Sequence, residues 1–181
     1  SSPLTISANI TIDGNGFEIS ATDTFDGDAM FIIEPVAGDV LLKNMKMNAR
    51  SMAKVIEASS GHLILEECTV VNGYSNDYSA GVHVKGNATL ELLGGEIKDN
   101  SSTTQSSYLI YGSDLCIESE AEGEIVLIDN GTIIGNMLIN PVENQPNDSG
   151  IVVLGDGSIE NAYVGYANEK AATLNYVSGE I

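Results

Sequence analysis

Acidic side chains gathered in one turn are the first residues in this sequence that could bind a ligand. Asp23, Asp26 and Asp28 stand close together in the segment TDTFDGDA, and carboxylate oxygens are the ligands that Ca²⁺ prefers. The segment lacks the full spacing of a calcium-binding loop and its distant glutamate. We therefore expect a solvated acidic loop, with a calcium site at these three aspartates as the alternative and no other cofactor.

Histidine and cysteine are the other residues that could do chemistry. His62 and His83 have no Cys or Asp at a metal-ligand or triad spacing, so both are expected on strand surfaces. Cys68 and Cys116 are too far apart in the sequence for a zinc motif. The alternating glutamates of segment 118–124 are expected on one solvated face. No residue is assigned a catalytic role.

The charge balance limits the partners of the chain. Lys and Arg together number 7 against 26 Asp and Glu, which gives a formal charge of −19. Such a charge repels nucleic acid and anionic lipid, whereas neutral glycans, cations and basic protein surfaces remain as partners to consider. No apolar run approaches the roughly 18 to 20 residues of a membrane-spanning helix. We expect no nucleic-acid partner and no membrane insertion.

Asparagines in N-x-S/T sequons favour a secreted protein, although a chain rich in Asn, Ser and Thr also forms such triplets by chance. The candidate glycosylation sites are Asn9, Asn87, Asn100, Asn130 and Asn147. Loop tyrosines could stack on sugar rings or simply pack a loop against the rest of the protein. These tyrosines are Tyr74, Tyr78, Tyr108 and Tyr111.

One phrase recurs along the chain: a short apolar alternation, a polar or glycine step, a second alternation and a turn that contains Asn. Period-two alternation is typical of β-strands, and a repeat of this length is typical of a solenoid. The predicted inward sets are Val40, Leu63, Leu90 and Ile125; Leu42, Leu65, Leu92 and Leu127; and Met47, Val70, Ile97 and Ile133. Asn48, Asn72, Asn100 and Asn136 end the phrases and are expected either to stack their amides or to act as ordinary turn residues.

The spacing of the phrases predicts the architecture. The shortest step, from Leu42 to Leu65, is 23 residues, and the other steps are longer by amounts that variable loops would explain. We predict an all-β, single-stranded, right-handed parallel β-helix of about seven coils, in one domain over residues 1–181. Val82 and Val84 should face inward, with His83 and Lys85 outward.

Two segments carry a resemblance to a known family. The phrases SAGVHVKGNATLELLGGEIKDNSS (79–102) and LTISANITIDGNGFEI (4–19) resemble pectin-lyase-like β-helix domains of bacterial and archaeal adhesin-like surface proteins. The resemblance implies the fold over most of the chain and an extracellular or cell-surface location. The pectate lyase and polygalacturonase motifs of this fold are not met, because Arg50 is the only arginine and Gly61-His62 continues into Leu63.

The repeat also predicts where the cysteines and the chain ends lie. Cys68 aligns with Met45 and Gly95, whereas Cys116 falls at the outward phase of His83. We expect no disulfide between the two, with Cys116 the better candidate for a free thiol or an intermolecular link. The final segment ATLNYVSGEI repeats ATLELLGGEI (88–97), and no cap is expected at either end. The chain is then a segment of a longer repeat protein, or copies stack end to end into a homo-oligomer or polymer.

Two functions therefore compete. The first is a non-catalytic, extracellular structural or adhesin-like protein that self-assembles into a surface layer, sheath or fibre. The alternative is a carbohydrate-active protein, either an enzyme resembling a polysaccharide lyase or hydrolase or a glycan-binding module.

Overall fold

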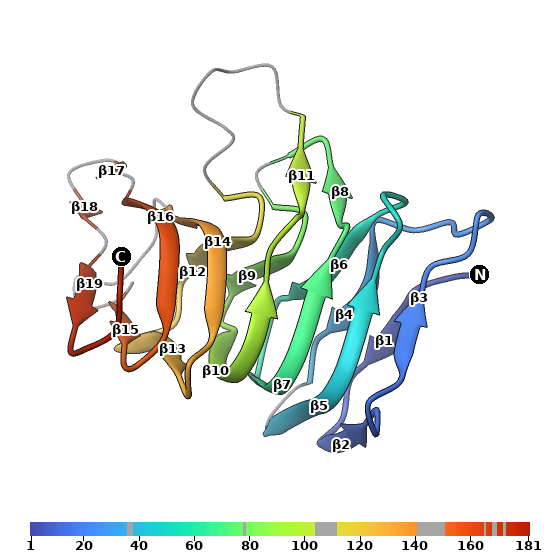
Figure 1. Ribbon diagram of the computed structural model, residues 1–181, viewed down its shortest axis with the longest axis horizontal. Coiled ribbons are helices and arrows are strands. Elements are labelled where there is room, and N and C mark those ends of the chain that lie inside the picture. The colour runs from blue at the N-terminus through green and yellow to red at the C-terminus, as the bar shows by residue number, and fades with distance from the viewer. Residues whose placement is uncertain are drawn as a thin grey trace.

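The chain folds into a parallel β-solenoid, in which the strands of successive coils stack side by side along the long axis (Figure 1). The computed structural model describes residues 1–35, 38–77, 79–103, 112–140, 151–164, 166–167, 170–171 and 173–181. Within these ranges there are strands and turns but no helix, hence no helix that could cross a membrane. The predicted all-β parallel solenoid is confirmed.

The first face of the solenoid is a ladder of short parallel strands. Its side chains alternate between the coil interior and the outside, and Val82 and Val84 are buried in the interior as predicted. The ladder runs through β1 (Leu4–Ile6), β4 (Ala29–Ile33), β6 (Lys54–Ala58), β9 (Val82–Gly86), β12 (Leu115–Ser119) and the end of β14 (Ile133–Ile139).

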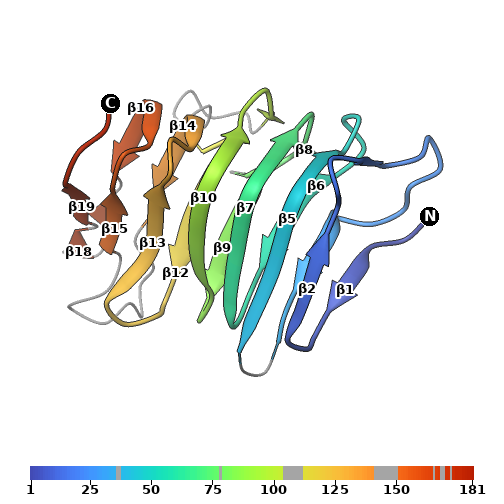
Figure 2. The ribbon, with the colours of Figure 1, turned by 60° about the horizontal axis from the view of Figure 1, so that its bottom comes forward.

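Long strands that bend at a corner supply the remaining faces, and Figure 2 shows β5, β7 and β10 side by side. Asn44, Glu67 and Gly94 hold equivalent corner positions with positive φ, a left-handed conformation that turns the chain. This corner is the predicted polar or glycine step. The strands are β2 (Ile10–Asp13), β3 (Glu18–Ser20), β5 (Asp39–Asn48), β7 (His62–Val71), β10 (Thr89–Ile97), β13 (Glu124–Asp129), β15 (Ile151–Leu154), β16 (Ser158–Val164) and β19 (Thr173–Tyr176).

Two small sheets lie off the main ladders. β8 (Tyr74–Ser75) pairs in parallel with β11 (Ser101–Ser102), and β17 (Tyr166–Ala167) pairs antiparallel with β18 (Lys170–Ala171). The amide of Tyr74 also donates to the carbonyl of Ala53 over 2.9 Å, which attaches β8 beside the start of β6.

Apolar side chains stacked from coil to coil fill the interior, as the repeat predicted. The same registers connect the last segment, because Leu174 and Tyr176 continue the ladders of Leu90 and Leu92. The buried, paired sets are Val40, Leu63 and Leu90; Leu42, Leu65 and Leu92; and Met47, Val70 and Ile97.

The alignment of the repeat at 124–136 was wrong by one residue in all three sets, and in the first set Leu90 pairs with Val126 rather than Ile125. Leu92 pairs with Ile128 rather than Leu127, and Ile97 pairs with Ile134 rather than Ile133. Ile128 and Ile134 are fully buried, whereas Ile133 is exposed. The run IVLI is apolar in both phases, so alternation alone could not choose between them.

The solenoid makes about five turns, fewer than the predicted seven coils. β2 at one end and β19 at the other have a paired neighbour on one side within the described structure.

Asparagine stacking is found for part of the predicted set. Asn72 Nδ2 donates to Asn48 Oδ1 over 3.1 Å, which links two adjacent coils through their amides. Asn100 and Asn136 are joined instead through the buried carboxylate of Asp114.

Candidate functional site

The outward side of the first face carries polar side chains that are buried. Glu57 of β6, His83 of β9 and Cys116 of β12 lie at one level of the ladder. His83 is only 7% exposed and Cys116 is 0% exposed, although both alternate with residues that face the coil interior. The expected surface position of His83 is therefore wrong, and the free thiol expected at Cys116 is present but buried. Both cysteines are free, so the expectation of no Cys68–Cys116 disulfide is confirmed.

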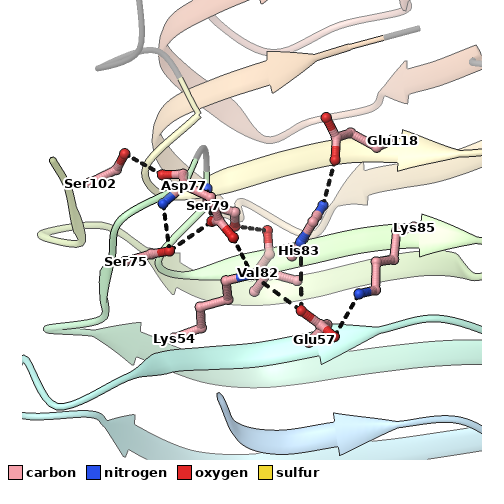
Figure 3. Close-up of polar contacts among 10 residues, drawn as sticks. All are labelled: Lys54, Glu57, Ser75, Asp77, Ser79, Val82, His83, Lys85, Ser102 and Glu118. Carbon is pink, nitrogen blue, oxygen red and sulfur yellow. Dashed lines mark hydrogen bonds and ion pairs between the residues drawn. The ribbon is translucent and has the colours of Figure 1, made fainter. Parts of the chain in front are cut away.

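The segment after β7 explains part of this burial. Asp77 lies in the turn after β8, and its Oδ2 is 2.8 Å from Lys54 Nζ at the start of β6. The Ser75 hydroxyl and the Ser79 amide donate to Asp77 Oδ1 over 2.7 and 3.4 Å (Figure 3). This turn is thereby held against the ladder, and the Lys54 side chain is buried beneath it.

His83 lies between two carboxylates, as Figure 3 shows. Its Nε2 is 2.8 Å from Glu118 Oε2, and its Nδ1 is 3.9 Å from Glu57 Oε2, beyond hydrogen-bond distance. Nδ1 is thus a buried nitrogen without a hydrogen-bond partner among the described residues. The hydrogen bond to His83 lowers the pKa of the Glu118 carboxyl, against the opposing effect of burial. Asn140 Nδ2 donates to the other oxygen, Glu118 Oε1, over 2.6 Å.

Two lysines hold Glu57 in its charged form. Lys85 Nζ is 2.7 Å from Glu57 Oε1, and Lys54 Nζ is 3.2 Å from Glu57 Oε2. Burial by itself would raise the pKa of the Glu57 carboxyl, but the two lysines outweigh burial and the pKa is lowered. Burial likewise opposes the ionisation of Asp77, and Lys54 and Ser75 outweigh it to lower the Asp77 pKa.

The thiol of Cys116 completes the cluster. One ligand atom each from His83, Cys116 and Glu118 lies within 4.8 Å of those of the other two. Burial raises the pKa of the Cys116 thiol well above its ordinary value, and the nearby Glu118 charge adds to the effect. Because the thiolate is the nucleophilic form, this cysteine is not an activated nucleophile. The cluster instead offers sulfur, nitrogen and oxygen donors to a metal ion.

A cleft of about 600 Å³ opens beside this cluster. Its lining includes both charged partners of Lys54, namely Glu57 and Asp77, as well as Lys85 and Tyr74. Lys54 contacts both Glu57 and Asp77, and Lys85 contacts Glu57, so these charges in the wall already have partners of opposite sign.

The three aspartates proposed as calcium ligands do not converge. Asp23, Asp26 and Asp28 are all exposed, and Asp23 Oδ1 is paired with Arg50 Nη2 at 2.8 Å. In the part of the chain that the structure describes, they do not form a group whose ligand atoms all lie within 4.8 Å of one another. The structure places them as separate surface carboxylates.

The sequons fall in different environments. Asn9, Asn87 and Asn130 are exposed, and Asn147 lies outside the described residues. Asn100 is buried, and its Nδ2 donates to the carbonyls of Val70 and Lys98 and to Asp114 Oδ1. A glycan on Asn100 would require this part of the coil to open.

The remaining sequence candidates are dispersed. His62 is part-exposed, with Nε2 3.5 Å from Glu91 Oε2. The Tyr74 hydroxyl lies 3.2 Å from the Thr103 hydroxyl. The other loop tyrosines, Tyr78, Tyr108 and Tyr111, lie outside the described residues.

Comparisons with known proteins found no match to this chain among protein families, curated proteins or solved structures.

Proposed function

We propose that this chain is a non-catalytic structural segment of an extracellular or cell-surface protein, and that its terminal coils pack against further β-helix coils. Those coils belong either to the same polypeptide or to a neighbouring copy in a surface layer, sheath or fibre. The proposal rests on one observation: several apolar side chains at inward positions of the terminal coils are exposed, whereas their partners one coil further in are buried.

The first coil shows this contrast on all its faces. Leu4 is in register with Phe31, Ile10 with Val40 and Ile19 with Met47. The three inner partners are at most 2% exposed. Ile10, by contrast, is 45% exposed, and Leu4 and Ile19 are similarly open to solvent. A further coil on this side would bury all three.

The last coil repeats the contrast at the opposite end. Tyr176 is in register with Leu154, and Val164 with Ile139. Leu154 and Ile139 are buried, whereas Tyr176 is 60% exposed and Val164 is also exposed. Figure 1 places these strands and β1 at opposite ends of the long axis. Both ends thus offer apolar side chains and strand edges to a stacked coil.

The charged state of three carboxylates in or beside the cleft supports a non-catalytic role. A glycosidase needs a carboxylic acid whose pKa is raised so that it can protonate the leaving group. The pKa values of Glu57, Asp77 and Glu118 are all lowered. These groups, which lie in or beside the charged cleft, are therefore unsuited to act as that acid.

The adhesin-like part of the proposal rests on the sequence resemblance and on charge. A net charge of −19 keeps a β-rich particle soluble between binding events, and exposed sequons such as Asn9 and Asn87 suit a secreted protein.

Self-association of the isolated chain tests the proposal. In the native protein the covering coils come from the same polypeptide or from a neighbouring copy, but in either case the uncovered terminal coils of the isolated chain should pair with those of another copy. Sedimentation velocity should show association that increases with concentration, and negative-stain images should show particles joined end to end. Ile10→Lys should disperse them, since it would place a charge in the stacked interface. Thr11→Lys, on the outward side of the same strand, is the matched control and should associate normally.

A chain that remains monomeric at high concentration would contradict stacking. Incubation with a panel of polysaccharides checks the enzymatic alternative separately. We expect no new reducing or unsaturated ends above a heat-inactivated control, and turnover would overturn the non-catalytic proposal.

A further inference from the structure

The cluster of His83, Cys116 and Glu118 has the donor set of a transition-metal site. Thiolate, imidazole and carboxylate together suit Zn²⁺, whereas Ca²⁺ and Mg²⁺ prefer oxygen ligands alone. Neighbouring ligands of a tetrahedral zinc ion lie roughly 3.5 Å apart, given bonds of about 2.0–2.3 Å. The three donor atoms are within 4.8 Å of one another, close to the spacing that a zinc ion requires.

The fold fixes these donors on paired strands. His83 and Cys116 occupy equivalent positions on β9 and β12, and Glu118 follows on the same side of β12 two residues later. Strands hold side chains more firmly than loops do, which favours a defined coordination geometry. An ion bound here would link two adjacent coils.

Charge also favours a divalent ion at this place. Zn²⁺ displaces the thiol proton, so the site would contain one thiolate, one carboxylate and a neutral imidazole. Their charges sum to zero with the ion, which lowers the cost of burial. Without an ion, the buried Cys116 thiol remains protonated, and among the described residues Glu118 Oε2 has His83 Nε2 as its hydrogen-bond partner.

Groups around the donors are arranged as an outer shell. A zinc-bound histidine usually donates its other N–H to a carboxylate. His83 Nδ1 is buried, has no hydrogen-bond partner among the described residues and faces Glu57 Oε2 at 3.9 Å. Lys85 and Lys54 hold Glu57 in place. On the other side, Asn140 binds Glu118 Oε1 and leaves Oε2 directed at the site.

We propose that His83 Nε2, Cys116 Sγ and Glu118 Oε2 bind a zinc ion, with water in the fourth position and Glu57 accepting the Nδ1–H of His83. This inference is independent of the proposed structural function. Binding fixes the proton of His83 on Nδ1, and Glu57 becomes the hydrogen-bond partner of that nitrogen. The Cys116 proton is released to solvent.

Cobalt is the probe for this site, because Co²⁺ substitutes for Zn²⁺ and a thiolate ligand gives an intense near-ultraviolet charge-transfer band. Reduced, chelator-treated protein would be titrated with Co²⁺, both in the native state and during refolding from urea, since the site is buried. We expect one equivalent to produce the band and Zn²⁺ to abolish it by displacement.

Matched variants locate the donors. Cys116→Ala should abolish the band and weaken Zn²⁺ binding by about tenfold or more, whereas Cys68→Ala, at the other buried cysteine, should leave both unchanged. Cys116→Ser provides a second test if the alanine variant does not fold. Glu57→Gln should keep the band but weaken affinity about tenfold. Absence of the band in the wild-type protein, or its persistence in a folded Cys116 variant, would overturn the proposal.

Discussion

The carboxylate of Asp114 lies between Asn100 and Asn136 and accepts two hydrogen bonds from each. Its Oδ1 accepts from the backbone amide and Nδ2 of Asn100 at 3.0 and 2.9 Å. Its Oδ2 accepts from the backbone amide and Nδ2 of Asn136 at 2.7 and 3.2 Å. Asp114 is 1% exposed, so these donors take the place of water around a buried charge.

Asp114→Ala should therefore lower the free energy of unfolding by about 3–5 kcal/mol, because buried N–H groups lose their acceptor. Urea denaturation followed by circular dichroism measures this. Asp156→Ala is the control, since the exposed Asp156 accepts one bond from the Gly131 amide over 2.8 Å and its loss should cost about 1 kcal/mol or less. Equal losses would show that burial of Asp114 does not carry the effect.

The register of β13 can be checked by paired substitutions. Ile128→Ala should destabilise the protein by about 2–5 kcal/mol, because Ile128 is fully buried and stacks on Leu92. Leu127→Ala should cost clearly less, since Leu127 is on the outward side and only half-buried. If urea denaturation showed a larger loss of unfolding free energy for Leu127→Ala than for Ile128→Ala, the predicted alignment of Leu127 with Leu92 would be correct.

The fold could be predicted because apolar residues recur at the inward positions of successive repeats. Val40, Leu63 and Leu90 recur in the same phase, and each packs on its counterpart in the next coil. The prediction failed where that signal is ambiguous. The run around Ile128 is apolar in both phases, so alternation alone could not decide which of its residues turn inward.

The cluster at His83 was missed for a different reason. The alignment already placed Cys116 level with His83, but an outward phase was equated with exposure. An outward residue is buried when another segment of the chain packs over it. Here the turn carrying Asp77 packs over the outward side of β6. Val55 was an available signal, since this apolar residue directly before Ile56 is fully buried. An apolar run across both phases of a strand indicates a face that is covered.

Both thiols should resist modification in the folded protein. Burial raises the pKa of Cys68 to about 11 and that of Cys116 well above its ordinary value, so at pH 8 neither forms appreciable reactive thiolate. With Ellman's reagent we expect negligible reaction in native buffer and two equivalents in denaturant. An exposed cysteine introduced by Thr11→Cys serves as the positive control. Rapid native labelling of Cys116 would contradict the burial of this thiol.

Glu18 should make stability depend on pH in the acidic range. Hydrogen bonds from Ser20 and Asn48 and the contact with Lys46 lower the pKa of Glu18 from 4.5 to about 2. A carboxyl whose pKa is depressed by folding stabilises the folded state above its unfolded pKa, and that contribution is lost as pH falls from about 4.5 toward 2.

The difference between wild type and Glu18→Gln isolates this contribution from the general relief of charge repulsion on acidification, which both proteins share. Urea midpoints should favour the wild type at pH 6, and the gap should close by about pH 2. Glu122→Gln, at another exposed glutamate, is the matched control for loss of one negative charge. A Glu18 gap that stays constant from pH 6 to pH 2 would show that the contacts of its side chain stabilise the first coil independently of ionisation.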